Sequence, residues 1–276
     1  VCKMIKYNIF ENGNLILNDK KQKSYNFKKT ETLFIFHGLY GRARNWQSIA
    51  KELSNNYLFT IVTVDLRNHG ENKFEEDHSY SLMAKDIIEL FQFLNIQRTN
   101  ILGHSMGGKL AMILSIKHPQ CINKLIIADI APISYENNET KIIDALINLD
   151  LNLIKTRNDA DNFLSKEILD KSLRLFLLQN LKFTDNNLRW TINLKAIKNS
   201  LNNLKAFPEF NKINKFNNKT LCVYGANSNY VNENNLTDFN IFFTDMSFKK
   251  IEGAGHWLHA EKPKEFIYII TQFLNN

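Results

Sequence analysis

Short apolar runs alternate with longer segments of helical periodicity along this chain, and this alternation constrains its fold most. The apolar runs are rich in β-branched residues and cover residues 33–36, 60–64, 100–102, 124–128, 220–224 and 247–251. Runs of this kind are typical of parallel strands that are buried on both faces. Residues 81–94, 105–117 and 263–274 have the spacing of amphipathic helices. The sequence therefore predicts an α/β fold with a mostly parallel, doubly wound sheet.

The alternation stops between residues 132 and 218, where only helix-like segments are visible, at 140–149, 160–169 and 171–181. A helical insertion between two strands of a parallel sheet is best interpreted as a cap over one end of that sheet. Ligands of such sheets bind outside the carboxyl ends of the strands, so a cap there would cover the binding site. We therefore expect an α/β core of residues 1–131 and 219–276, with a helical cap at 132–218 inserted late in the chain.

The charge balance is basic, with 35 Lys+Arg against 28 Asp+Glu and a formal net charge of +7. A basic surface can bind nucleic acid or an anionic membrane. The basic residues form no dense block, however, and Lys is over-used together with Asn, Ile and Phe, which indicates a bias of composition. We expect no nucleic-acid partner, while an acidic acyl carrier stays open. The hydrophobic fraction of 44% and the length of 276 residues suit one globular domain with one sizeable insertion.

Cysteine usage and hydropathy bear on the compartment. Cys2, Cys121 and Cys222 are widely spaced and odd in number, which favours neither a disulfide framework nor a zinc site. No apolar run reaches the ~18 residues of a membrane helix, and no signal peptide is apparent. We expect a cytoplasmic monomer or homodimer. Because the chain begins at Val1, a missing upstream segment that directs it to a mitochondrion or another organelle stays open.

The strongest chemical signal is the pentapeptide Gly103-His104-Ser105-Met106-Gly107, a G-x-S-x-G between a predicted strand and a predicted helix. In that context it is typical of a nucleophile elbow, a tight turn that exposes the serine hydroxyl above the sheet. The helix that follows also directs its positive dipole end toward a developing oxyanion. Ser105 is therefore the predicted nucleophile.

A serine nucleophile needs a base and an acid. His256 follows the last predicted strand, in the loop GAGHW, and alone among the seven histidines it occupies the expected place for the base. The acid usually follows the strand at 220–224, but Ser228 stands there. Asp129, at the end of the preceding strand, is the predicted acid, with Ser228 as an auxiliary hydrogen-bond partner. A helix- or loop-capping role for Asp129, or Asp238 or Asp245 as the acid, stays open.

An oxyanion hole requires two backbone N–H groups, one of them on the residue after the nucleophile. Met106 supplies that one, and Leu39, in the loop HGLYG after the first predicted strand, supplies the other, with Tyr40 as an alternative. We place His37, Tyr40 and Trp257 beside the substrate, although His37 suits a structural role at the strand end better. Further positions stay open: Phe163, Leu175 and Phe176 as walls of an acyl pocket, and Asp65 with Arg67 as a tie within the loop DLRNHG.

These residues identify the chain as similar to the α/β-hydrolase superfamily over nearly its whole length. Within that superfamily, the combination HGLYG, DLRNHG, GHSMGGK, DIAP, GANSNYV and GAGHWLHAEKP resembles the YbfF-type esterases and their mitochondrial relatives. In that group the acid is carried by the aspartate of the DIAP segment, here Asp129, and a serine at the position of Ser228 joins it. The resemblance implies hydrolysis of short acyl esters, with acyl-CoA thioesters as further candidate substrates.

The expected reaction is therefore two-step acyl transfer through an acyl-enzyme on Ser105, without a metal or organic cofactor. Other chemistries of the same fold are the rivals: C–C bond hydrolysis, a lyase reaction as in menaquinone synthesis, or perhydrolysis. A rival of another class is a ligand-sensing protein that keeps the elbow without turnover. The cap is the part least similar to the esterases, and it would set the choice of substrate.

Overall fold

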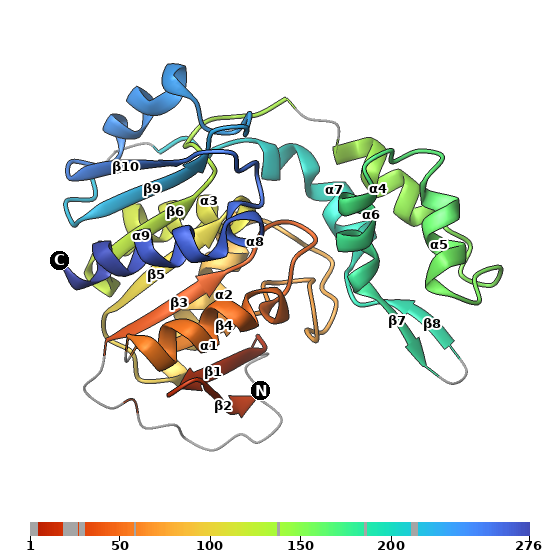
Figure 1. Cartoon of the computed structure of the whole chain (residues 1–276), viewed down its shortest axis with the longest axis horizontal. Coiled ribbons are helices and arrows are strands. Elements are labelled where there is room, and N and C mark those ends of the chain that lie inside the picture. Colours follow the sequence, from red (N-terminus) through yellow and green to blue (C-terminus); the bar gives the residue numbers. More distant parts are fainter. Residues whose placement is uncertain are drawn as a thin grey trace.

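The computed structural model describes residues 5–18, 27, 31–57, 59–136, 139–184, 187–210 and 215–276, and within them an eight-stranded sheet forms the centre of the molecule (Figure 1). Its strand order is β10-β9-β6-β5-β3-β4-β1-β2. The strands are β1 (Tyr7–Glu11), β2 (Asn14–Asn18), β3 (Thr32–Phe36), β4 (Thr60–Val64), β5 (Thr99–His104), β6 (Ile122–Ala128), β9 (Thr220–Gly225) and β10 (Met246–Ile251).

Six of these strands pair in parallel, from β10 to β4, and each contains one of the six apolar runs. Strand β1 pairs antiparallel with both β4 and β2, which adds two strands that the sequence analysis did not predict. The prediction of a mostly parallel α/β sheet is therefore confirmed. A parallel sheet brings the carboxyl ends of its strands to one edge, and the loops after β3, β5, β6 and β9 meet there.

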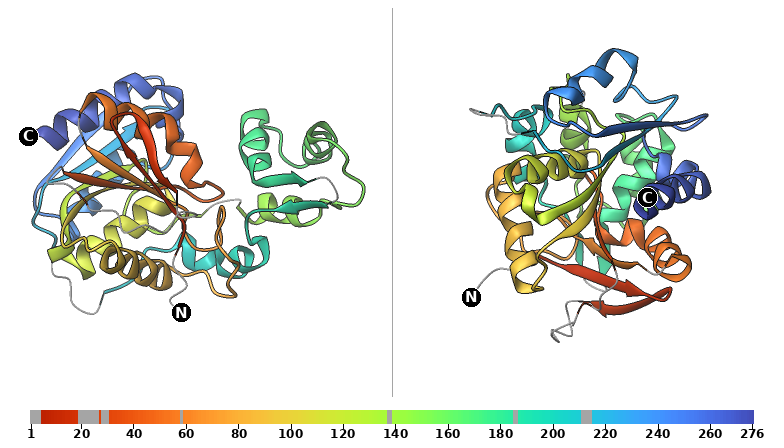
Figure 2. Two further views of the ribbon diagram at one scale, coloured as in Figure 1. Left: turned by 90° about the horizontal axis from the view of Figure 1, so that it is seen from below. Right: turned by 90° about the vertical axis from the view of Figure 1, so that its left-hand side faces the viewer.

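Helices cover both faces of the sheet (Figure 2). The helices α1 (Gln47–Asn56) and α9 (Pro263–Asn275) lie on one face, and α2 (Tyr80–Phe93) and α3 (Met106–Lys117) lie on the other. Alternate residues of β3 separate into two core clusters, with Leu33 and Ile35 facing α1 and α9, and Phe34 and Phe36 facing α2 and α3. This two-sided burial explains why the central strands consist of unbroken apolar runs.

Between β6 and β9 the chain forms a smaller body at the carboxyl ends of the strands, to the right in Figure 1. It contains α4 (Glu139–Ile147), α5 (Arg157–Leu164), α6 (Lys171–Leu177) and α7 (Leu194–Lys205). It also contains the antiparallel hairpin β7 (Leu181–Thr184) and β8 (Asn187–Trp190), so the expectation of helices alone in this region is wrong. Side-chain caps define several helix starts, because Thr156, Asp170 and Asn193 accept hydrogen bonds from the first-turn amides of α5, α6 and α7.

Several polar contacts join this smaller body to the sheet region, and three of them involve loops or helices next to the strand ends. Asn180 Nδ2 donates to the Tyr40 carbonyl over 2.7 Å, in the loop after β3. The Asn193 amide donates to the Asn68 carbonyl over 2.9 Å, in the loop after β4. The ammonium of Lys109, on α3, donates to the Lys205 carbonyl over 2.6 Å at the end of α7.

Among the described residues, no helix combines the length and the hydropathy of a membrane span.

Candidate active site

Ser105 lies at a strained turn between β5 and α3. Its backbone has φ 53° and ψ −119°, a conformation that few residues with a side chain adopt. The flanking glycines make this turn possible, because a Cβ on Gly103 would lie 2.3 Å from the Gly107 carbonyl oxygen, and one on Gly107 would lie 2.5 Å from the Phe36 carbonyl oxygen. The G-x-S-x-G pattern therefore has a steric reason here, and it lifts Ser105 out of the sheet.

Asp129 and His256 meet at the same edge. Asp129 follows β6, is 0% exposed, and its Oδ2 accepts a hydrogen bond from His256 Nδ1 over 2.7 Å. The Ser228 hydroxyl donates to the same carboxylate oxygen, and the Gly225 amide donates to Oδ1 over 3.1 Å. A buried carboxylate requires several donors, and the loops after β9 and β10 supply them.

The two other acids considered from the sequence occupy different places. Asp238 belongs to the 3-10 helix η5 (Glu233–Ile241) and lines a separate surface hollow together with Pro132 and Phe207. Asp245 is exposed just before β10. Asp129 is the carboxylate that the structure brings to His256.

Two further side chains hold His256, and sequence reasoning missed both. The Tyr230 ring stacks on its imidazole, with ring centroids 4.0 Å apart. His104 Nε2–H donates to the His256 carbonyl over 2.8 Å, so the residue before Ser105 also fixes the loop that carries His256. Burial holds the pKa of His104 well below its ordinary value, which keeps this ring neutral. The position of His104 inside the G-x-S-x-G motif was a signal in the sequence, whereas Tyr230 lies in a loop without a recognisable pattern.

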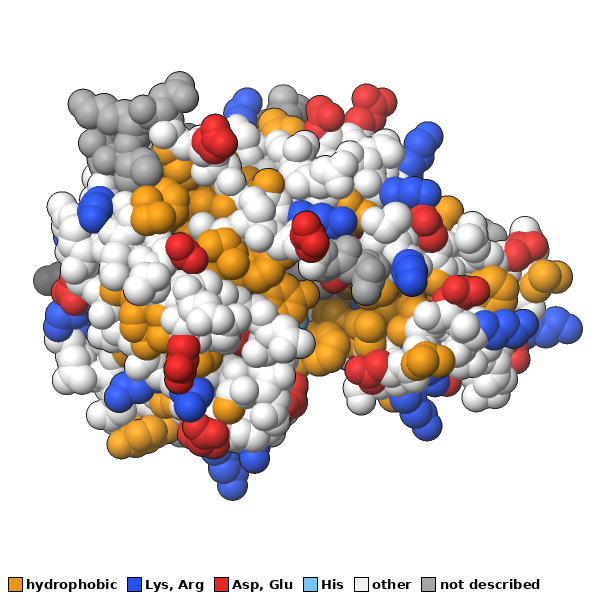
Figure 3. Space-filling view, turned by 90° about the horizontal axis from the view of Figure 1, so that it is seen from above, with side chains coloured by type: hydrophobic (Ala, Val, Ile, Leu, Met, Phe, Trp, Pro, Cys, Tyr) orange, Lys and Arg blue, Asp and Glu red, His pale blue; other side chains and the backbone are white. Residues whose placement is uncertain are grey.

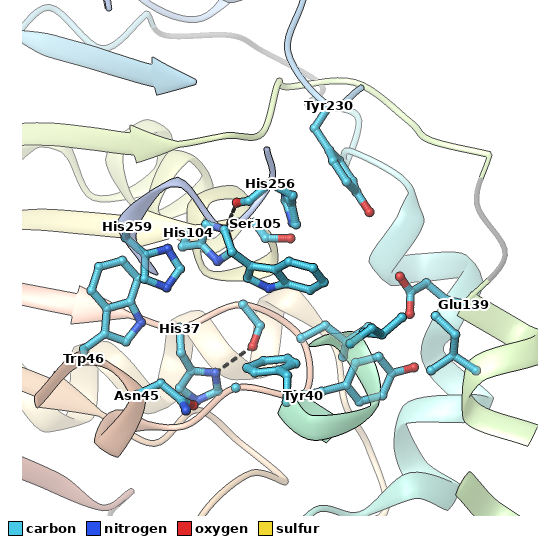
Figure 4. A pocket seen from close by; sticks show the side chains of 17 residues that line it. His37, Tyr40, Asn45, Trp46, His104, Ser105, Glu139, Tyr230, His256 and His259 are labelled. Carbon is cyan, nitrogen blue, oxygen red and sulfur yellow. Dashed lines mark hydrogen bonds between the residues drawn. The ribbon is translucent and has the colours of Figure 1, made fainter. Parts of the chain in front are cut away.

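Ser105 and His256 both line a cavity of about 250 Å³, and Figure 4 shows the two side chains directed into it. Apolar and aromatic side chains form most of its wall: Leu39, Tyr40, Trp46, Ile142, Leu173, Phe176, Tyr230 and Trp257. Figure 3 shows apolar side chains gathered in the hollow between the larger and the smaller part of the molecule. A hydroxyl and an imidazole at a largely apolar cavity, with a buried carboxylate bonded to the imidazole, are the groups that acyl-transfer enzymes use.

The loop after β3 passes directly against Ser105. A Cβ on Gly38 would lie 2.9 Å from His104 Nδ1 and 3.1 Å from the Ser105 Cβ, so a glycine favours this close approach. A second cavity, of about 50 Å³, is lined by Leu39, Ser105 and Met106 together. The two residues expected to supply oxyanion donors are thus brought to the same place as Ser105.

The three residues expected beside the substrate all line the larger cavity, but they differ in character. His37 is locked in the β3 loop, because its Nδ1–H donates to the Gly38 carbonyl over 2.8 Å and its Nε2 accepts from the Leu66 amide over 2.9 Å. Burial lowers the pKa of His37 to about 4, so it is neutral, in agreement with a structural role. Tyr40 adopts a φ of 61°.

The Trp257 indole contacts Phe176 of α6, with ring centroids 5.8 Å apart, and both line the cavity. The other two wall residues that the sequence suggested lie elsewhere: Leu175 is 52% exposed, and Phe163 packs against the main core cluster.

We expected Asp65 and Arg67 to pair with each other, but each has other partners. Arg67 forms a two-point ion pair with Asp86 of α2, over 2.8 Å. Asp65 instead accepts hydrogen bonds from the Ala43 amide over 2.7 Å and the Glu71 amide over 3.1 Å. The loop is therefore closed by side-chain-to-backbone bonds, as expected, but not by a charge pair within it.

Comparisons with known proteins agree with this fold. Residues 31–263 match the family model described as alpha/beta hydrolase fold. The chain is 34% identical over 248 residues to the sn-1-specific diacylglycerol lipase ABHD11 of Danio rerio, covering 88% of this chain and 78% of that protein. It is 31% identical over 261 residues to esterase YbfF of Escherichia coli strain K12, covering 94% of this chain and 99% of that protein.

Among solved structures, a marine microorganism esterase superposes with a TM-score of 0.87 at 34% identity, covering 98% of this chain and 99% of that one. The resemblance to the YbfF-like esterases is thereby confirmed. The chain belongs to the alpha/beta hydrolase fold family.

Proposed function

We propose that the protein is a serine carboxylic-ester hydrolase. The observation that carries this proposal is the 2.7 Å hydrogen bond between the buried Asp129 carboxylate and His256, at a cavity that Ser105 also lines. A serine becomes a strong nucleophile only when a base can take its proton, and the base acts best when a carboxylate orients it. The similarity to proteins named as esterases and a lipase supports the same reaction type.

In the first half-reaction the Ser105 Oγ attacks the ester carbonyl carbon, and His256 Nε2 takes the hydroxyl proton. The carbonyl π electrons move to oxygen, and the N–H groups of Leu39 and Met106 stabilise that oxyanion. When the tetrahedral intermediate collapses, His256 returns the proton to the leaving alcohol. The products of this step are an acyl-enzyme on Ser105 and a free alcohol.

In the second half-reaction water replaces Ser105 as the nucleophile. His256 takes a proton from water, which attacks the acyl carbon, and the same oxyanion donors act again. Collapse expels the Ser105 oxygen, which regains its proton from His256, and a carboxylic acid leaves. Asp129 stabilises the imidazolium in both steps, while Ser228 and Gly225 hold Asp129.

We propose short acyl esters as substrates, with acyl-CoA thioesters as a second class. A cavity of about 250 Å³ suits a small acyl group better than a long chain. Residues 132–218 act as the cap, and residues 1–131 and 219–276 as the core, because cavity residues such as Ile142 and Phe176 come from the inserted segment. The cap thus sets the shape of the acyl pocket.

A series of p-nitrophenyl esters with acyl chains from two to eight carbons tests the proposal. We expect the highest kcat/KM at the short end, and loss of turnover in Ser105→Ala with an unchanged circular dichroism spectrum. A fluorophosphonate probe should label the wild type and not Ser105→Ala. A ligand-sensing protein without turnover would hydrolyse no ester of the series and would not be labelled, and full activity of Ser105→Ala would overturn the proposal.

A further inference from the structure

Glu139 is the one carboxylate among the described residues that line the 250 Å³ cavity. It is the first residue of α4, so it enters the site from the inserted segment and not from the sheet. It also lines the smaller cavity, together with Leu39, Ser105 and Met106. Figure 4 shows its carboxyl group directed toward the space in front of Ser105.

The surroundings hold this carboxyl group in place. The Tyr40 hydroxyl lies against it, and Tyr230 and His256 face it across the cavity. Burial raises the pKa of Glu139, while Tyr40 and His256 act in the opposite direction. Asn180 fixes the Tyr40 backbone through a 2.7 Å hydrogen bond to its carbonyl. The acceptor is therefore preorganised before a substrate enters.

A carboxyl group in a largely apolar wall is costly unless hydrogen-bond donors satisfy it. A carboxylate has about four lone-pair sites, so Glu139 can accept a further hydrogen bond in addition to the contacts that it already makes. If Glu139 served only to connect α4 to Tyr40, its carboxyl group would not need to line both cavities beside Ser105. Its position suits an acceptor for a donor group on the substrate.

We propose that Glu139, braced by Tyr40, accepts a hydrogen bond from a hydroxyl group of the ester, so that the enzyme prefers hydroxylated esters and disfavours esters that carry a carboxylate. This inference rests on the proposed hydrolase function and specifies its substrate class. Glu139 is a specificity residue in this scheme and takes no part in the proton transfers.

Isosteric ester pairs test this directly, since each pair differs by a methyl group in place of a hydroxyl group. On the alcohol side the pair is 2-hydroxyethyl butyrate and propyl butyrate, and on the acyl side it is methyl 3-hydroxybutyrate and methyl isovalerate. A hydrogen bond to a charged acceptor contributes about 1.5–3 kcal/mol, so we expect roughly a ten- to hundredfold preference in kcat/KM for the hydroxylated member of one pair. The pair that shows it identifies the side that Glu139 contacts.

Substitutions assign the preference to Glu139. In Glu139→Leu the ratio within the responsive pair should fall to about one, and in Glu139→Gln, which keeps an acceptor oxygen, to an intermediate value. Glu139→Gln should also hydrolyse monomethyl succinate about tenfold faster than the wild type, because like-charge repulsion is removed. Glu167→Gln, an exposed glutamate of the same inserted segment, is the matched control and should leave all ratios unchanged.

The two proposals fail in different ways. Equal rates within both pairs in an active wild-type enzyme, or ratios that Glu139→Leu does not change, would overturn the role of Glu139 and leave the hydrolase proposal intact. A wild type that hydrolyses no ester would overturn the hydrolase proposal itself. Melting temperatures of the Glu139 variants close to the wild-type value would show that the ratios report on the site and not on folding.

Discussion

At the scale of single residues, Asp129 poses an electrostatic problem that its neighbours solve. Its carboxylate is 0% exposed, and burial of an unpaired charge is strongly unfavourable. His256, Ser228 and the Gly225 amide together give it three donors from two loops. These donors hold the carboxylate in position beside His256, which the proposed mechanism requires.

Removing parts of this arrangement should lower activity in a graded way. We expect Asp129→Asn to reduce kcat by orders of magnitude, up to about 10⁴-fold, because an amide does not stabilise an imidazolium. Ser228→Ala removes one hydrogen bond to a charged acceptor, worth about 1.5–3 kcal/mol, so we expect a smaller loss of roughly tenfold or more. Steady-state kinetics on a p-nitrophenyl ester measures both.

Asp238→Asn is the control for the choice of acid, since Asp238 lies in η5 beside another hollow. It should keep wild-type kcat. If Asp238→Asn lost most of its kcat while Asp129→Asn stayed active, the acid would have been assigned to the wrong residue.

Some of the site could be predicted from the sequence because its geometry imposes local residue types. Ser105 stands between glycines that sterics require, and His256 follows the last strand in a loop of small residues. Glu139 and Tyr230 were missed since no local pattern marks them. They reach the cavity only through the packing of the inserted segment and of the loop after β9 on the sheet.

At the scale of secondary-structure elements, the strands that are buried on both faces could be predicted from the sequence. The buried central strands are unbroken apolar runs, whereas β1 and β2 mix apolar with polar residues at one edge of the sheet and were missed. Their turn did carry a signal: Asn12 and Gly13 have φ of 49° and 73°, and Asn-Gly is the pair that tight hairpins favour. The hairpin of β7 and β8 was missed because its short strands lie among helix-like segments.

Lys109 links α3 to the end of α7, and both Lys109 and Lys205 line the smaller cavity beside Ser105. The Lys109 side chain is buried, and its ammonium donates to the Lys205 and Ala206 carbonyls over 2.6 Å and 3.1 Å. Burial lowers the pKa of Lys109 to about 7. The two carbonyl oxygens at a helix C-terminus favour the charged form, so we expect the contact to stabilise the fold despite its desolvation.

Replacing Lys109 by methionine tests this contact, because methionine keeps the apolar stem and removes the ammonium. Two partly buried carbonyl groups then lose their donor, and we expect the free energy of unfolding to fall by about 2–3 kcal/mol. That change corresponds to a melting temperature lower by roughly 5–10 °C for a chain of this size. Thermal unfolding followed by circular dichroism measures it.

Lys198→Met is the matched control in α7. Lys198 pairs with Asp144 over 2.6 Å, but both side chains are 40% exposed or more, so the pair should contribute less than about 1 kcal/mol. Equal melting temperatures for Lys109→Met and the wild type would mean that desolvation of the ammonium cancels its hydrogen bonds.

At the scale of the whole molecule, buried neutral histidines connect stability to pH. Five histidine side chains are buried: His37, His69, His78, His104 and His259. Burial lowers the pKa of His37 to about 4 and those of His69 and His259 to about 3, against 6.5 for the free side chain. These rings form contacts around the active-site loops, such as the stacking of His259 on Trp46 with centroids 4.2 Å apart.

The sign of the effect follows from linkage. Above pH 6.5 these histidines are neutral in both the folded and the unfolded chain, so their pKa shifts leave stability unchanged. Below pH 6.5 the unfolded chain takes up protons that the folded chain cannot, until the pH reaches the folded pKa values near 3 to 4. Stability is therefore lost as the pH falls, by about 1.4 kcal/mol per pH unit for each histidine.

The stability lost through His37, His69 and His259 together is at most about 4 kcal/mol per pH unit. The total stability of a typical domain is only about 5–15 kcal/mol. We expect the urea midpoint to be constant between pH 7 and 8 and to fall steeply between pH 6.5 and 5. His69→Gln removes one titrating ring and should make this fall less steep, whatever its effect at pH 7.5. A midpoint that stays level down to pH 5 would show that the buried rings take up protons in the folded state, through an opening that admits water to the loops around Ser105.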